Sequence, residues 1–238
     1  STVGSPFAQE ATRAAADPFP PPRAALTIAA SGADGGPTLL DLLRDFSAVT
    51  GHNLSIDDAT RSSAAQRGVG LLQSVEVPPA QVYSFVESLL LERGFVLTVQ
   101  RAQAPRLLGV HERQPGQDLP AWNVPAGELE RYRDHPAVMI STVLHLWPVD
   151  VRQLGNSLRA LSNDGTSIVP IGNTSSIILR GAGRRVAEMA WILESTAEAE
   201  REFAARQASR AAQDGERRGG AQGDEGKPEG REKPRNPR

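Results

Sequence analysis

The segment SSIILRGAGRRVAEMAWILE, residues 175–194, has the residue types and spacing most suggestive of chemistry. An apolar strand leads through two glycines into an amphipathic helix, which is the order of parts in a phosphate-binding motif. A dinucleotide fingerprint, however, requires a third glycine where Val186 stands, and a P-loop requires Gly-Lys-Ser/Thr, which is absent. We therefore interpret residues 181–183 as a turn that needs small residues, followed by the surface arginines Arg184 and Arg185. An anion held at the helix start by these two arginines is the alternative.

The remaining polar residues show no convergent arrangement. No two histidines have the i, i+4 spacing of a helical metal site, and the chain contains no cysteine. We expect each histidine to be exposed or bonded locally: His52, His111, His135 and His145. Asp57 and Asp58 are expected in a loop or a helix cap, because adjacent residues point apart rather than toward one atom. Since no serine lies in a Gly-x-Ser-x-Gly or Ser-x-x-Lys motif either, the sequence predicts a protein that is not an enzyme and has no cofactor or metal.

The composition limits the classes of partner. Of the 238 residues, 39% are hydrophobic and 23% are charged, and the formal net charge is −2. No overall basic field therefore attracts nucleic acid or an anionic membrane. No apolar run approaches the roughly 18 residues that span a bilayer, so we expect no membrane insertion by this chain. The absence of cysteine suits an oxidising envelope compartment, and the first ten residues could be the end of a signal peptide, although they lack an apolar core.

Residues 25–113 are predicted to form a small domain with the element order βαββαββ. Strands are expected at 25–30, 53–57, 68–77, 95–100 and 106–112, and helices with apolar residues at helical spacing at 38–50 and 80–93. Thr38 and Asp41 form a capping box at the start of the first helix, and Gly51 is placed for a left-handed residue at its end. Residues 1–24, which end in DPFPPPR, are predicted to be a flexible lead-in, because proline disfavours helices and central strands.

A second domain is predicted at 138–200 with the KH-like order βαββα. Its expected elements are a strand at 138–149, a helix capped by Asp150 at 150–162, strands at 166–172 and 175–181, and a helix from 184 to 200. Residues 114–137 lack a clean hydrophobic period and are interpreted as a linker. Residues 201–238 are expected to continue the helix for two or three turns and then to form a disordered charged tail. The predicted fold class is thus α+β, with two small helix-on-sheet domains and disordered termini.

A KH nucleic-acid module shares this order but requires a Gly-x-x-Gly clamp between two helices and a basic groove. Residues 139–200 contain no such clamp, and their five arginines are outnumbered by six acidic residues. Phosphate binding would lack its main driving force. The sequence therefore predicts no nucleic-acid partner.

Trp147 is a candidate contact residue. In STVLHLW, residues 141–147, Leu144 and Leu146 alternate with Val143, His145 and Trp147. If the two leucines face the helices, Trp147 lies on the open face or at the edge of the sheet, where large apolar residues usually mark a contact surface. A tryptophan covered by the linker or by the final helix is the alternative.

The order of motifs in residues 138–200 resembles the periplasmic ring-building (NolW-like) domain of bacterial secretins, the outer-membrane channels of type II secretion, type IV pilus and related systems. The resemblance rests on Leu144 to Leu146, on Leu154, Leu158, Arg159 and Leu161 in the capped helix, on Ile177 to Gly181, and on Ile192 to Glu194. Two positions depart from the family pattern. Ser175 stands where the family has asparagine, and Leu193-Glu194 stands where it has Leu-Asp.

Residues 25–113 resemble the preceding secretin domain, which also occurs at the front of signalling TonB-dependent receptors. The matching features are a short strand, a leucine-rich helix, Asn53 to Asp57, the junction Val77-Pro78, and Leu90 to Phe95. The resemblance does not extend to the channel-forming barrel domain of secretins. We therefore expect that this chain does not itself form the pore.

The resemblance implies a non-enzymatic periplasmic protein, associated with the outer membrane or cell envelope of a bacterium, that joins or builds a ring in a secretion or pilus system. Its implied partners are further copies of itself and other secretion or pilus components. Copies in a ring meet head to tail, so each needs two different patches. We expect one patch at Val143, Trp147 and the edge strand Ile168 to Ile171, and the other at Arg184 and Arg185 with the final helix.

Two alternatives remain open. A signalling or adaptor module of the TonB-receptor kind would grip a partner without forming a ring. An envelope enzyme is disfavoured because the sequence shows no convergent polar cluster.

Overall fold

The computed structural model describes residues 17–31, 35–114, 117–149, 151, 166–172 and 174–220, with side chains up to residue 210. Its strands are β1 (Leu26–Ile28), β2 (Asn53–Ile56), β3 (Val75–Val77), β4 (Phe95–Arg101), β5 (Leu107–Glu112), β6 (Trp122–Asn123), β7 (Met139–His145), β8 (Ser167–Pro170) and β9 (Ser176–Ala182). Its helices are α1 (Leu39–Thr50), α2 (Asp58–Gln66), η2 (Pro79–Gln81), α3 (Val82–Glu92), η3 (Ala126–Asp134) and α5 (Gly183–Gly220), of which η2 and η3 are 3₁₀ helices. The predicted α+β class is confirmed. The predicted disordered termini and, apart from Val151, the predicted helix at 150–162 lie outside the described residues.

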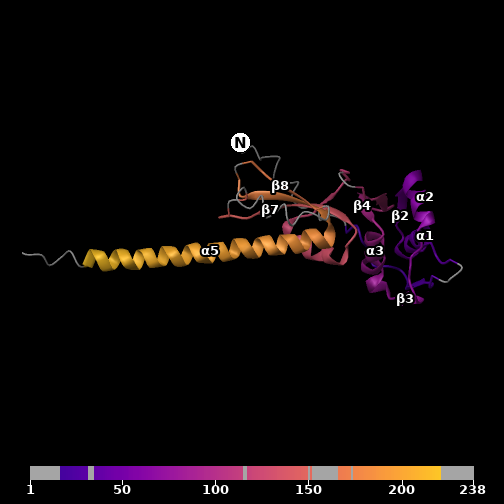
Figure 1. The fold of residues 1–238 in the computed structure, drawn as a ribbon, viewed down its shortest axis with the longest axis horizontal. Helices are drawn as coiled ribbons and strands as arrows, with labels where there is room; N and C mark the ends of the chain where they lie inside the picture. The colour runs from indigo at the N-terminus through magenta and orange to yellow at the C-terminus, as the bar shows by residue number, and fades with distance from the viewer. Residues whose placement is uncertain are drawn as a thin grey trace, which may run out of the picture.

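The first unit, residues 26–112, packs three α-helices against two small sheets (Figure 1). β1 pairs antiparallel with β3, and the second sheet has the strand order β2-β5-β4, in which β4 and β5 form the predicted hairpin. α1 starts at the predicted capping box of Thr38 and Asp41 and ends at Gly51, whose φ is 72°. These predictions are confirmed because caps and hairpins depend on residues close together in the chain.

The predicted element order of this unit is wrong at one place, because residues 58–66 form the additional helix α2. Its sequence DATRSSAAQ buries only Thr60 and Ala64, so it shows no apolar period that would indicate a helix. Asp57 caps α2 by accepting a hydrogen bond from the Thr60 N–H at 2.8 Å, which confirms its predicted cap role. The strand predicted at 68–77 shrinks to β3, and residues 69–74 form a loop.

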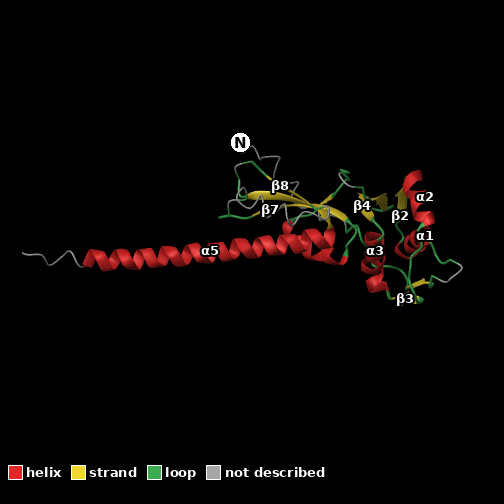
Figure 2. Ribbon diagram, viewed as in Figure 1, coloured by secondary structure: helices red, strands yellow, loops and turns green. Residues whose placement is uncertain are grey.

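The second unit, residues 117–220, is built on a four-stranded sheet with the order β6-β7-β9-β8 (Figure 2). One face of this sheet is buried and carries Ile140, Thr142, Leu144, Ile177 and Leu179. The described part of the predicted linker is instead part of this unit. β6 pairs with β7, and Leu129 and Tyr132 of η3 are buried where η3 meets α5. The division of the chain into the domains predicted above remains a prediction.

The two units share one hydrophobic core. Their buried side chains form a single cluster. Leu97 of β4 pairs with Val138, and the Leu97 N–H donates to the carbonyl oxygen of Ala137 at 2.8 Å. Phe19 is 8% exposed and belongs to the same cluster. The prediction of a flexible lead-in is therefore wrong for the residues around Phe19, because burial of this aromatic ring holds them on the body.

α5 begins at Gly183 directly after β9, so the turn predicted at 181–183 is absent. Neither Gly181 nor Gly183 has a left-handed backbone. Gly183 is small because another segment lies against it: a β-carbon there would be 2.6 Å from the carbonyl oxygen of His135 and 2.9 Å from that of Tyr132. The sequence correctly indicated a need for small residues but assigned it to the wrong cause.

α5 has 38 residues and is therefore about 57 Å long at a rise of 1.5 Å per residue. Its first turns bury side chains against the body, namely Val186, Met189, Ala190, Leu193 and Ala197. Every side chain from Glu198 to Arg210 is exposed. Figures 1 and 2 show this part leaving the body as a single helix. The helix extends well past the two or three turns predicted after Glu200.

We expect Gly183→Ala to lower the free energy of unfolding by about 1–3 kcal/mol, the usual cost of an overpacked site. The added methyl group must displace backbone carbonyl groups at the end of η3, which cannot move as freely as a side-chain tip. Gly127→Ala is the matched control, because a β-carbon at Gly127 meets nothing within 4 Å. Urea unfolding followed by tryptophan fluorescence measures both variants, and equal stabilities would contradict the close approach at Gly183.

Candidate protein-interaction surface

The outer face of the four-stranded sheet carries a row of apolar side chains. Val143 of β7, Ile178 of β9 and Val169 of β8 are direct cross-strand partners, so they lie side by side. Val143 is 52% exposed and Val169 is 48% exposed. Their neighbours along the strands, Leu144 and Leu179, point to the opposite face and are buried. The row, whose middle member Ile178 is half-buried, is thus a partly exposed apolar surface on the sheet.

Trp147 extends this surface beyond the end of β7. It is 62% exposed, whereas the preceding Leu146 is 1% exposed. The Leu146 N–H donates to the carbonyl oxygen of Ser175 at 2.7 Å, so the strand alternation continues past His145. Of the two alternatives left open for Trp147, the structure shows the exposed one, since neither α5 nor the described residues of the predicted linker cover it. We call Val143, Val169, Ile178 and Trp147 the outer patch.

The strand β8 lies at one edge of the described sheet, as predicted. It pairs with β9 on one side, so its other side presents backbone groups that no described strand uses. Ile168 is half-buried and packs on the core, and Ile171 is also half-buried. The exposed large apolar side chain of this edge is therefore Val169, beside the exposed Ser167 and Pro170. Sequence reasoning included Val169 only as part of the edge strand and missed Ile178, because the register that aligns them with Val143 is not visible in the chain order.

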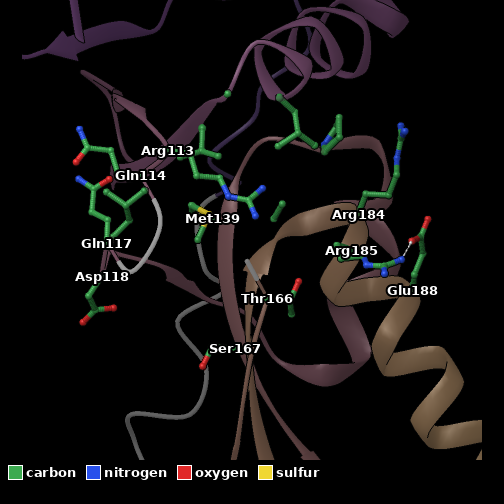
Figure 3. A pocket seen from close by; sticks show the side chains of 16 residues that line it. Arg113, Gln114, Gln117, Asp118, Met139, Thr166, Ser167, Arg184, Arg185 and Glu188 are labelled. Carbon is green, nitrogen blue, oxygen red and sulfur yellow. Dashed lines mark ion pairs between the residues drawn. The ribbon is translucent and has the colours of Figure 1, made fainter. Parts of the chain in front are cut away.

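Arg184 and Arg185 lie at the start of α5 and border a cleft of about 920 Å³ between the two units (Figure 3). The walls of the cleft include Gly94, Val96 and Arg113 of the first unit and Met139, Ser167 and Glu188 of the second. The Arg184 Nε donates to the carbonyl oxygen of Arg133 at 3.2 Å, and Arg185 pairs with Glu188 at 3.5 Å. Both guanidinium groups therefore have acceptors within the protein, which disfavours the anion-binding alternative.

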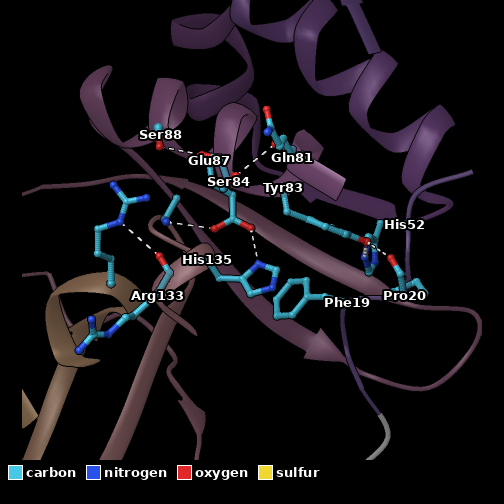
Figure 4. Close-up of polar contacts among 12 residues, drawn as sticks. Phe19, Pro20, His52, Gln81, Tyr83, Ser84, Glu87, Ser88, Arg133 and His135 are labelled. Atoms are coloured by element: carbon cyan, nitrogen blue, oxygen red, sulfur yellow. Dashed lines mark hydrogen bonds and ion pairs between the residues drawn. The ribbon is translucent and has the colours of Figure 1, made fainter. Parts of the chain in front are cut away.

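A buried carboxylate joins the two units (Figure 4). Glu87 of α3 is 0% exposed, and it accepts hydrogen bonds from His135 Nδ1 at 2.9 Å and from the Ala137 N–H at 3.1 Å. Burial raises the pKa of Glu87, and His135 and the backbone donors oppose this shift. The ring of Phe19 stacks on His135 with 4.0 Å between the centroids. We call the set of Glu87, His135, Ala137 and Phe19 the Glu87 contact.

His52 lies close to this contact and is 2% exposed. Its Nε2 is 3.1 Å from the hydroxyl oxygen of Tyr83, and that hydroxyl donates to the carbonyl oxygen of Pro20 at 2.8 Å. The hydroxyl of Tyr83 thus accepts from the Nε2–H of a neutral imidazole. Burial lowers the pKa of His52 to about 4, with Arg106 and His135 adding to the effect. His52 is therefore a neutral core residue at pH 7.

The expectation of exposed or locally bonded histidines is wrong for His52, which is buried, and for His135, whose partner Glu87 is 48 residues away in the chain. His111 and His145 hydrogen-bond to residues of the adjacent strands. His111 Nε2 is 3.0 Å from Thr98 Oγ1, and His145 Nδ1 is 3.0 Å from Ser176 Oγ. Among the described residues, no group of three or more His, Cys, Asp and Glu side chains could hold a metal ion. Within the same residues, no helix has both the length and the apolar character needed to cross a membrane.

Glu87 is the key residue that sequence reasoning missed. It lies on the buried side of α3 with Val82, Tyr83, Val86 and Leu90. A carboxylate on such a stripe signals an internal partner, because glutamate is almost never fully buried unless paired. The partner His135 is 48 residues further along the chain, so spacing alone could not identify it.

The chain matches no protein-family profile and no curated protein. The solved structures that resemble it include XcpQN012, at 13% identity and a TM-score of 0.29, covering 73% of this chain and 65% of that one. The N-terminal domain of the secretin XcpQ from Pseudomonas aeruginosa matches at 12% identity and a TM-score of 0.24, and the match covers 73% of this chain and 64% of that one. The GspC-GspD complex of the type II secretion system of enterotoxigenic Escherichia coli matches at 16% identity and a TM-score of 0.28. That match covers 74% of this chain and 99% of the other chain. This chain spans less than two thirds of both XcpQ structures, and at these scores the likeness carries no argument about function.

We expect the free energy of unfolding to fall as the pH is lowered from about 6.5 to about 4, in part because of His52. Over this range the unfolded chain binds a proton at His52, whereas the folded protein does so only near the lower limit, so the stability present above pH 6.5 is lost progressively. The variant His52→Gln should show a shallower pH slope in urea unfolding. Ser62→Gln, at an exposed position on α2 without a titratable side chain, is the control and should keep the wild-type slope. Equal slopes in wild type and His52→Gln would contradict the neutral buried state.

Proposed function

We propose that this chain is a non-enzymatic protein-interaction module of a secretin-type secretion or pilus system, acting in the periplasm in ring assembly or partner docking. The observation that carries the proposal is the outer patch, an apolar group on the open face of a sheet next to the free edge of β8. Contiguous exposed apolar residues usually mark a surface that contacts another protein. The choice of system rests on the order of packing motifs, which resembles two secretin domains.

The outer patch suits two modes of association. Another protein surface can pack flat on Val143, Ile178 and Val169, and an extended segment can add to the edge of β8. On this face His145 bonds Ser176, and the positive charge of Arg180 pairs with Asp118. The face therefore offers apolar area without a free positive field, which favours a protein partner over nucleic acid.

Ring assembly requires a second, different surface, because neighbouring copies meet head to tail. We place it at Arg184 and Arg185 with the adjoining part of α5, which lie on a different element from the outer patch. A copy would then present its sheet to the start of the next copy's final helix. If the same patch meets only a different protein, the chain acts as a docking adaptor.

We expect the double variant Val143→Asp with Val169→Asp to weaken association at least about tenfold, because each carboxylate must be desolvated in the contact. Light scattering over a concentration series measures self-association, and a photocrosslinker at Trp147 in the bacterial envelope measures partner contact. The control for the variant is Ser62→Asp, at an exposed position on α2, and the control for crosslinking is the same photocrosslinker at Ser62.

A crosslink from Trp147 to a second copy supports the ring, and one to another secretion or pilus component supports docking. A chain that stays monomeric at every concentration and yields no crosslink from Trp147 would contradict both. Association of the double variant with wild-type affinity would show that the outer patch is not the contact.

A further inference from the structure

The second half of α5 has no partner in the described structure. From Glu198 onward the helix makes no buried contact, and all of its side chains to Arg210 are exposed. Helices in proteins draw most of their stability from packing, and a stretch without tertiary contacts is marginal in water. Three large apolar side chains on this helix nonetheless face solvent. Trp191 is 62% exposed. The other two are Ile192, which is 42% exposed, and Phe203, which is 59% exposed.

These two residues lie on one stripe of α5. Positions alternately four and three residues apart stay on one side of a helix. Following that spacing from Ile192, the stripe contains Ile192, Thr196, Ala199, Phe203, Arg206 and Arg210. The residues that α5 buries against the body, including Ala190, Leu193 and Ala197, lie outside this stripe, and every residue of the stripe is exposed. The stripe is therefore accessible along its whole length, even where α5 touches the body.

The distribution of charge along α5 distinguishes a parallel from an antiparallel pairing of two such helices. Residues 194–202 contain four glutamates and one arginine, whereas residues 203–213 contain two arginines and no acidic residue. In a parallel pair of identical helices, Arg206 and Arg210 would face their own copies, and the acidic stretches would face each other. In an antiparallel pair with Phe203 opposite Ala199, residues 194–199, which include Glu194 and Glu198, lie beside residues 203–208 of the other helix, which include Arg206.

We propose that the stripe from Ile192 to Arg210 is a self-association surface, on which two copies of the chain pair through antiparallel α5 helices. Phe203 of each copy packs on Ala199 of the other, a large residue beside a small one. In the same register Thr196 lies opposite Arg206, and Ile192 lies opposite the alkyl stem of Arg210. The contact uses the same stripe of both copies, so it is distinct from the head-to-tail contact proposed for the outer patch.

The full chain is the sample, and sedimentation velocity over a concentration series is the measurement. We expect a reversible dimer that weakens with added salt, because part of the attraction is between exposed charges. Phe203→Asp should raise the dissociation constant at least about tenfold, since the carboxylate would be desolvated in the contact. Ala208→Asp is the control, because Ala208 is equally exposed on α5 but lies on the side opposite the stripe. It should dimerise like the wild type.

The absence of cysteine allows a direct test of direction. Protein carrying Thr196→Cys is mixed with protein carrying Arg206→Cys under mild oxidation. An antiparallel pair predicts that the mixed disulfide forms faster than either like-with-like disulfide. Faster like-with-like coupling would show a parallel pair and overturn the proposal. So would a chain that is monomeric at all concentrations, or a dimer that Ala208→Asp disrupts and Phe203→Asp does not. None of these outcomes bears on the contact proposed for the outer patch, because Phe203→Asp changes no residue of that patch.

Discussion

The buried carboxylate of Glu87 is the constraint on which the arrangement of the molecule depends. A fully buried glutamate is costly unless it is hydrogen-bonded, and both donors to Glu87, His135 and the Ala137 N–H, come from the segment that leads into β7. That segment also pairs Val138 with Leu97 of the neighbouring sheet. Phe19 covers the outer side of His135. The start of the second sheet is thereby tied to α3 and β4 of the first unit.

This joint determines which surfaces remain free. The inner face of the second sheet packs on α5 and the core, and η3 covers the beginning of α5. Among the described residues, the outer patch, the edge of β8 and the projecting part of α5 are surfaces that remain exposed to other polypeptides. Because the two units share one core, these surfaces keep a fixed direction relative to the first unit. A protein whose purpose is to place contact surfaces benefits from such a joint more than from a loose tether.

The features that sequence reasoning predicted are those that depend on near neighbours: the capping box of Thr38 and Asp41, the left-handed Gly51, and the alternation that exposes Val143 and Trp147. The features it missed depend on residues far apart. Glu87 is paired with His135, which lies 48 residues further along the chain. The side of α2 that is buried carries only Thr60 and Ala64, so it is too polar to indicate a helix. Phe19 stands among prolines that suggested a lead-in, yet its ring belongs to the core. That Val169 and Ile178 lie side by side in the outer patch is known only from the register of β8 and β9.

The claim that the Glu87 contact holds the two units as one body is tested most directly by a distance between them. Spin labels at Ser62→Cys on α2 and Ser167→Cys on β8 can be placed without background, because the chain has no native cysteine. Double electron–electron resonance should give one narrow distance distribution in the otherwise wild-type chain and in the exposed-site control Glu92→Ala. It should give a broad distribution in Glu87→Ala, where the donors of His135 and Ala137 lose their acceptor. A distribution that is already broad with Glu87 present, or that stays narrow in Glu87→Ala, would contradict the account.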